Sequence, residues 1–141
     1  MKLSLENIKD YADTLVLQVR GGGRELDYSE ASIQTVEELL QVSDELMRGD
    51  NFPDAQRNLI VFYNGCYLGQ VLSDNLIGVW RFDENWYDST IVFPYQGGGI
   101  QIHPFHKLFR RVTESLEENN LVTYYQGLKE RIDGDTGNLS E

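Results

Sequence analysis

The chain has 141 residues, of which 23 are acidic and 12 are basic, so its formal net charge at neutral pH is −11. A chain of this length is predicted to form one domain with a hydrophobic core, which we place at residues 1–132. The acidic excess argues against nucleic acids and anionic membranes as partners. If the partner is a protein, the same excess favours a basic one.

A single cysteine, Cys66, excludes an intrachain disulfide bond. We expect it to be a small buried apolar side chain rather than a nucleophile. Residues 1–6 contain no apolar segment of the kind found in signal peptides, which predicts a cytoplasmic location. No uninterrupted apolar run approaches the ~20 residues needed to span a bilayer.

The first predicted element is a helix that begins near Ser4. Apolar residues recur there at steps of three and four, namely Leu5, Ile8, Ala12, Leu15 and Val19. Residues 14–20 also alternate between apolar and polar, so this half is compatible with either a helix or a strand. The glycines at 21–23 end the element.

Residues 26–47 are predicted to form one longer helix. Asp27 followed by Glu30 resembles a capping box. The buried stripe is expected to contain Ile33, Val36, Leu39, Leu40, Leu46 and Met47. The opposite face, with Glu37, Glu38, Asp44 and Glu45, is expected to be solvated, and the alternative is that it receives a basic partner.

A central helix is predicted between Phe52 and Ile77, and the rest of the chain is expected to pack on it. Pro53 suits the first helical turn, where its missing N–H is not needed. Gly65 and Gly69 lie one turn apart on the same face and allow another segment to approach closely. We expect tight packing within the chain there, and the alternative is an opening for a ligand.

Three short strands are predicted after this helix, at residues 78–82, 90–93 and 100–103. They are rich in aromatic and β-branched residues and are joined by short polar or glycine-bearing connections. Such a series predicts a three-stranded antiparallel meander. The fold class is therefore α+β, with the meander packed on the central helix and helices before and after it.

Two helices are predicted to follow, from Pro104 to about Glu118 and from Asn119 or Asn120 to Ile132. The basic cluster on the first, Lys107, Arg110 and Arg111, is expected to pair with Glu114 and Glu117 one turn away. Residues 133–141 contain little apolar surface and are predicted to be a flexible tail.

The connection between the first two strands is the first candidate site. It combines acidic and aromatic side chains in Asp83, Glu84, Trp86 and Tyr87. On a rigid sheet, such residues form a surface suited to protein recognition. The alternative is that Trp86 folds back onto the edge of the core.

The second candidate is a pocket beside Gly65 and Gly69, bordered by Tyr67, Asn75, Trp80 and His103. The histidines, His103 and His106, are too few for a zinc site, and no HExxH motif or cysteine pair accompanies them. We therefore assign no metal ligand, no cofactor and no catalytic residue.

Three segments together resemble an uncharacterised bacterial protein family. They contain an LDxS start, a YLGxVxxxNLxGxW block and an Asn-Pro-Phe block followed by a basic helix. The matching residues are Leu26, Asp27, Ser29, Tyr67, Leu68, Gly69, Val71, Asn75, Leu76, Gly78, Trp80, Pro104, Phe105 and Arg111. His103 departs from the pattern, because Asn is usual there. The resemblance implies an α+β domain of bacterial or bacteriophage type, and the family has no established activity to transfer to this chain.

These features lead to two main functional hypotheses. The first is a non-enzymatic protein-binding domain of a small acidic bacterial protein, comparable to toxin-neutralising immunity proteins. The alternative is a small-molecule-binding or hydrolytic domain that uses the pocket beside Gly65 and Gly69. Self-association through exposed aromatic side chains is a third option.

Overall fold

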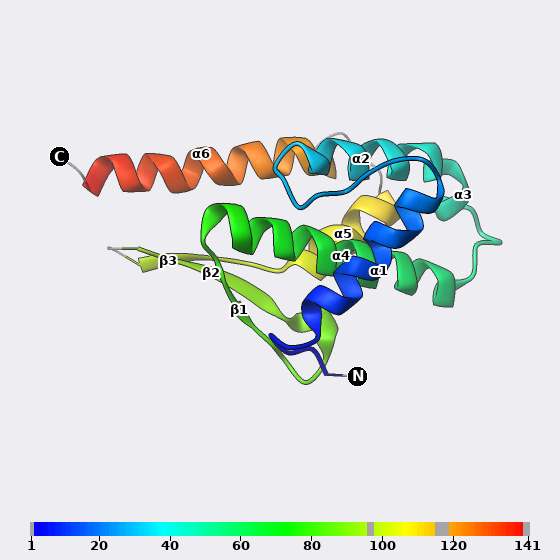
Figure 1. Ribbon diagram of the computed structural model, residues 1–141, viewed down its shortest axis with the longest axis horizontal. Helices are drawn as coiled ribbons and strands as arrows, with labels where there is room; N and C mark the ends of the chain where they lie inside the picture. The colour runs from blue at the N-terminus through cyan, green and yellow to red at the C-terminus, as the bar shows by residue number, and fades with distance from the viewer. Residues whose placement is uncertain (1, 96–97, 115–118, 140–141) are drawn as a thin grey trace.

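The computed structural model describes residues 2–95, 98–114 and 119–139. Helices and strands follow one another in an α+β arrangement in which the strands form a single block (Figure 1). In chain order the elements are α1 (Ile8–Gly21), α2 (Ser32–Val42), α3 (Asp44–Arg48), α4 (Asp54–Leu76), β1 (Val79–Arg81), the 3-10 helix η1 (Trp86–Asp88), β2 (Thr90–Tyr95), β3 (Gly98–Ile102), α5 (Pro104–Glu114) and α6 (Leu121–Leu139).

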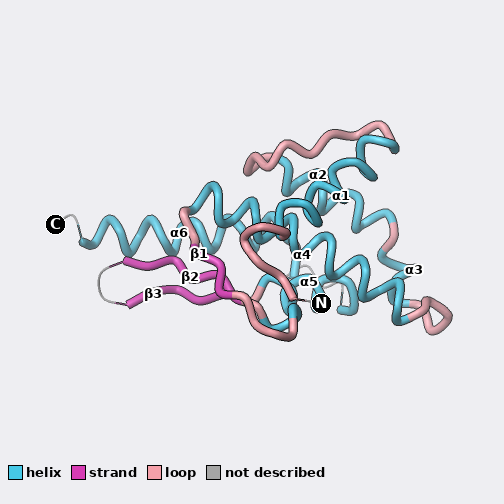
Figure 2. Tube along the Cα trace, turned by 60° about the horizontal axis from the view of Figure 1, so that its bottom comes forward, coloured by secondary structure: helices cyan, strands magenta, loops and turns pink. Residues whose placement is uncertain are grey.

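Helix α4 is the central element, as the sequence predicts. Pro53 is extended and precedes the first helical turn, and the helix runs through the buried Cys66 to Ile77, which ends it in the left-handed conformation. Strands β1, β2 and β3 pair antiparallel in that order, so the predicted meander is confirmed. The strands lie at one end of the molecule, and α3 with the loop before α4 lies at the other (Figures 1 and 2).

The two glycines in α4 allow α5 and the sheet to approach its axis. A Cβ atom on Gly65 would overlap the ring of Phe105 in the first turn of α5, and one on Gly69 would overlap the ring of Trp80 on β1. The predicted tight packing within the chain is therefore confirmed. The rings fill the volume that side chains of α4 would otherwise occupy.

Helix α1 resolves the alternative that the sequence left open, because residues 14–20 are helical. Leu15 and Val16 are both buried, whereas Leu17 is exposed. That pattern follows the helical period and not the alternation of a strand. The helix begins at Ile8, after a turn in which the Ser4 N–H donates to Asn7 Oδ1 at 2.8 Å and the Asn7 N–H donates to Ser4 Oγ at 3.3 Å.

The prediction of one helix across residues 26–47 is wrong, because two helices meet at Ser43. The expected capping box does not form. Asp27 Oδ1 accepts hydrogen bonds from the Ser29 N–H (3.0 Å) and hydroxyl (2.5 Å), while Tyr28 has φ +64°. Glu30 instead accepts a hydrogen bond from the Tyr125 hydroxyl on α6. The left-handed turn at Tyr28 delays the start of α2 to Ser32.

The last two helices begin where the sequence predicts. Asn120 caps α6, since its Oδ1 accepts from the Val122 N–H at 2.9 Å and the Thr123 N–H at 3.1 Å. Helix α5 is described to Glu114, and residues 115–118 lie outside the described part of the chain. Helix α6 continues to Leu139, across most of the stretch expected to be a tail. Residues 140 and 141 lie outside the described part, and the flexibility of residues 133–141 stays a prediction.

Candidate functional site

The β1–β2 connection, predicted to recognise a partner, is tied together by its own side chains. The Asp83 N–H donates to the buried hydroxyl of Ser89 at 3.0 Å, and Asp83 Oδ2 accepts from the Asn85 N–H at 2.9 Å. Asn85 Oδ1 in turn accepts from the Tyr87 N–H at 3.3 Å and begins η1. Asp83 and Glu84 remain exposed, so the connection presents carboxylates on an ordered loop.

The aromatic residues of this connection face the core instead of solvent. The ring of Trp86 lies edge-on to Phe62 and Phe105, at 5.0 Å from each ring centre. Tyr87 packs against His106 at 4.4 Å. Both side chains are half-buried. Trp86 therefore folds back onto the edge of the core, which is the alternative considered from the sequence.

The two histidines form a stacked pair beside this connection. Their ring centres are 4.7 Å apart, and His106 Nε2 lies 3.0 Å from Asp88 Oδ1. Burial lowers the pKa of His103, and the neighbouring His106 lowers it further. Within the described residues no group of three or more His, Cys, Asp or Glu side chains is placed to hold a metal ion. The pair joins η1 to α5.

Tyr67 and Asn75, expected to border a pocket, hold the loop before α2. The Tyr67 hydroxyl accepts from the Tyr28 N–H at 2.9 Å and donates to Ser32 Oγ at 2.7 Å. Asn75 Nδ2 donates to the Tyr28 carbonyl at 2.9 Å. Both backbone groups of the left-handed Tyr28 are thus bound by side chains of α4. The LDxS start and the YLGxVxxxN block meet at this point.

The other two residues of the expected pocket lie apart from these. Trp80 is buried against Gly69 and stacks on Phe82 at 5.1 Å between ring centres. Its Nε1 has no hydrogen-bond partner among the described residues. His103 lies at the stacked histidine pair. The space beside Gly65 and Gly69 is occupied by aromatic rings, and the cavities described below are lined by other residues.

A groove between α1, α2, α3 and α4 is a concave feature that sequence reasoning missed. It consists of three adjoining cavities of about 340, 290 and 400 Å³. The first two share Leu15, Gln18, Ile60 and Asn64, and the last two share Phe52 and Gln56. We call this feature the helical groove. Each volume is comparable to that of sites that bury a ligand or a few side chains.

The lining of the helical groove is mainly apolar. The first cavity is lined by side chains of α1, α2, α3, α4 and the loop before α2, and they include Leu15, Leu26, Val36, Leu39, Leu40, Met47 and Ile60. Leu59 and Leu46, which line the other two cavities, expose 55% and 66% of their surface. Large apolar side chains that are both exposed and adjacent to a groove are typical of binding surfaces.

The rim of the groove near α3 is fixed by Arg57. Its Nη2 and Nε donate to the Met47 carbonyl at 2.6 and 3.1 Å, and its Nη1 donates to Asp54 Oδ1 at 2.8 Å. The guanidinium also lies 5.4 Å from the ring centre of Phe52. These contacts tie the end of α3 to the start of α4 and hold Phe52 at the rim.

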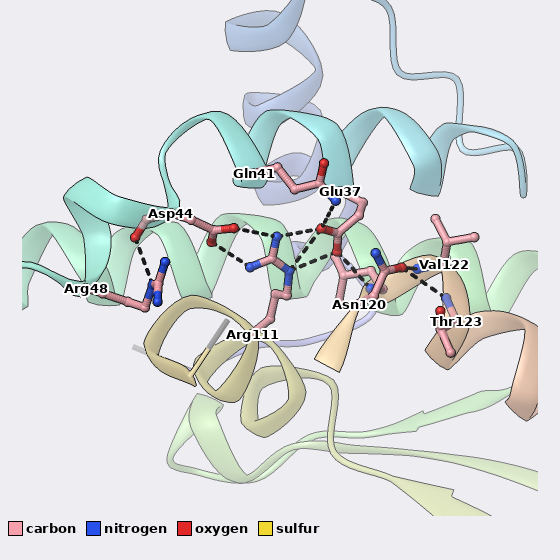
Figure 3. Close-up of polar contacts among 9 residues, drawn as sticks. Glu37, Gln41, Asp44, Arg48, Arg111, Asn120, Val122 and Thr123 are labelled. Atoms are coloured by element: carbon pink, nitrogen blue, oxygen red, sulfur yellow. Dashed lines mark hydrogen bonds and ion pairs between the residues drawn. The ribbon is translucent and has the colours of Figure 1, made fainter. Parts of the chain in front are cut away.

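The wall formed by α2 and α3 is anchored by a buried ion network (Figure 3). Arg111 on α5 donates to Glu37 through Nε (2.9 Å) and Nη2 (2.5 Å), and to Asp44 through Nη1 (2.7 Å). The side chains of Arg111 and Glu37 expose only 3% and 2% of their surface. Glu37 also accepts from the Leu121 N–H at 2.8 Å and from Gln41 Nε2 at 3.0 Å. Arg111 therefore joins α5 to α2 and α3, and Glu37 also ties α2 to the start of α6.

This network corrects two expectations. Glu37 and Asp44 were expected on a solvated face, and Arg111 was expected to pair within its own helix. Burial alone would lower the pKa of Arg111, but its hydrogen bonds to the two carboxylates outweigh burial and raise that pKa. Lys107 likewise bonds outside its helix, donating to Asn119 Oδ1 at 3.2 Å. Of the two carboxylates expected to pair with the basic cluster, Glu114 accepts from Asn119 Nδ2 at 3.0 Å, and Glu117 lies outside the described residues.

Comparison with known proteins gives no relative to set beside this geometry. No family model, curated protein or solved structure matches the chain. The resemblance to an uncharacterised bacterial family therefore stays a prediction. Among the described residues, no helix combines the length and apolar character required to cross a membrane.

Proposed function

We propose that the chain is a cytoplasmic, non-enzymatic protein-binding domain with a basic protein as its partner. The observation that carries this proposal is the helical groove, where exposed leucines border cavities large enough to receive side chains of another molecule. The net charge of −11 adds long-range attraction for a basic partner. An immunity protein that neutralises a bacterial toxin is one form of this function.

The groove has the preorganisation that a binding surface requires. Arg57 fixes its rim, and the network of Arg111 fixes its α2–α3 wall. Fewer groups then have to be ordered when a partner binds, which lowers the entropy cost of association. Cys66, by contrast, is fully buried and burial raises the pKa of its thiol, which argues against a nucleophilic role.

Site-specific photocrosslinking in the native cell tests the proposal. A photoreactive amino acid replaces Leu59 in the groove or, as a matched control, Val79 on β1. The two side chains expose 55% and 54% of their surface, so accessibility is the same and only location differs. We expect a defined crosslinked protein from the Leu59 position and not from the Val79 position. Equal or absent crosslinking at both positions contradicts the proposal. A toxin gene next to this one would give independent support.

A further inference from the structure

The walls of the helical groove restrict the backbone conformation of an occupant. Four helices line it, together with residues of the loops before α2 and α4, and the backbone N–H and C=O groups of the helices are mostly paired within the helix. No strand of the described sheet lines the three cavities, so an extended segment would find no edge with which to pair. A segment buried here must satisfy its own backbone groups, and a helix does so.

The length of the groove fits a short helix. Along α4, counted from its N-cap, the lining residues run from Pro53 to Asn64. At 1.5 Å per residue this distance is about 16 Å, or roughly three helical turns. A helix lying along it presents apolar side chains at positions i, i+4 and i+7 on the face that meets the groove.

The charges near the groove differ between its two ends. At the α3–α4 end, Glu45 and Asp50 line the third cavity and are exposed, and their carboxylates form no hydrogen bond or ion pair with the residues that the structure describes. At the other end Arg24 lines the first cavity, with its Nη2 3.5 Å from Glu38 Oε2. The charged residues that line the α3–α4 end are therefore two carboxylates, and the one that lines the first cavity is a cation.

We propose that the helical groove receives an amphipathic helix of the partner protein, oriented so that lysine or arginine side chains lie against Glu45 and Asp50. This inference rests on the proposed function and names the chemistry of the bound segment. Its apolar stripe contacts Leu15, Leu59 and Ile60, and its basic end occupies the α3–α4 end of the groove. The hydrophobic contacts supply affinity, and the charges set orientation and the rate of association.

Binding of synthetic peptides to the full chain tests the inference. The probe is a peptide of about three turns with leucine at i, i+4 and i+7 and two lysines at one end. It is stapled on the outer face, because short helices are marginal in water. Two matched peptides carry glutamate in place of lysine, or the same leucines in scrambled order. Fluorescence anisotropy of the labelled peptides gives the dissociation constants.

Variants of the protein assign the binding to the groove. Leu59→Gln is expected to weaken the lysine peptide about tenfold, and Val79→Gln, at matched exposure, is expected to leave it unchanged. Glu45→Gln combined with Asp50→Asn is expected to weaken it about three- to tenfold at about 50 mM salt, with a smaller effect at about 0.5 M. The control pair Glu6→Gln and Glu130→Gln removes two exposed charges elsewhere.

Several outcomes overturn the inference. These are absence of binding by the lysine peptide, equal binding by the glutamate peptide, equal binding by the scrambled peptide, and equal effects of the groove and control variants. If Leu59 still crosslinks a partner in cells while the peptide test fails, the proposed function stands and the helical occupant is wrong. Failure of both tests removes both.

Discussion

Replacing Arg111 by methionine is predicted to destabilise the protein by leaving Glu37 buried without its cation. Arg111 is almost fully buried and makes two hydrogen bonds to Asp44 and three to Glu37. Removal of one partner of a buried ion pair costs about 3–5 kcal/mol. Glu37 keeps its bonds from the Leu121 N–H and from Gln41, so we expect the lower end, about 3 kcal/mol.

Urea and thermal unfolding measure this loss. For a chain of 141 residues, an unfolding entropy of about 2.1 cal/mol/K per residue converts about 3 kcal/mol into a fall in Tm of roughly 10 °C. Arg110→Met is the matched control, because Arg110 is the preceding residue of α5 and is exposed. We expect its effect to stay within about 0.5 kcal/mol.

A second substitution separates the buried charge from lost packing. Glu37→Gln in the Arg111→Met background removes the charge and keeps an oxygen that accepts from the Leu121 N–H. We expect it to recover about 1–2 kcal/mol, because a neutral amide is much less costly to bury than a carboxylate. If the single variant loses less than about 1 kcal/mol, or the double variant is no more stable than the single, the reasoning about the buried charge is wrong.

Three further predictions concern glycines, the end of α4 and the histidine pair. Gly69→Ala should destabilise the protein by about 1–3 kcal/mol, because the added Cβ meets the indole ring of Trp80. Gly127→Ala has open space around it and should stabilise α6 by up to about 1 kcal/mol. Urea unfolding of the two variants measures both changes. Ile77→Gly should stabilise by about 1 kcal/mol, since Ile77 is 81% exposed and has φ +57°; an unchanged midpoint would contradict this. The pKa of His103 should lie below 6.5 by NMR, mainly through burial, and His106→Asn should raise it. As the pH falls below 6.5, His103 is protonated more readily in the unfolded chain than in the folded one, so it reduces the stability of the fold. A measured pKa of His103 at or above 6.5 contradicts this prediction.

The fold was predictable where a local pattern is repeated over many residues. Helix α4 and the meander have long or regular patterns, and the two glycines indicate close packing whatever segment fills the space. The break at Ser43 was not predictable in this way. Both sides of it have helical composition, and Asp44, the first residue of α3, bonds to Arg111 on α5, far along the chain.

The buried network could have been suspected from one signal. Glu37 lies between Ile33 and Leu40 on the same helical row, so a carboxylate interrupts a row that is otherwise apolar and buried. A charge in such a position requires a partner. The sequence does not indicate which one, because Arg111 lies 74 residues further along the chain. Charge patterning within one helix favoured a local pairing that tertiary packing replaces.

The helical groove depends on the same tertiary placement. Residues 59–62 are four consecutive apolar residues of α4, which together cover a full helical turn. The sequence does not show which of these four side chains are covered by other helices and which stay exposed. The positions of α1 and α2 decide this. Glu37 and Val36 point in directions about 100° apart on α2, so the residue that anchors α2 to α5 leaves the adjacent one free to line the groove. Helix α2 therefore contacts the buried ion network with one face and lines the helical groove with another. The charge that is costly to bury on one face holds the wall of the groove in place on the other.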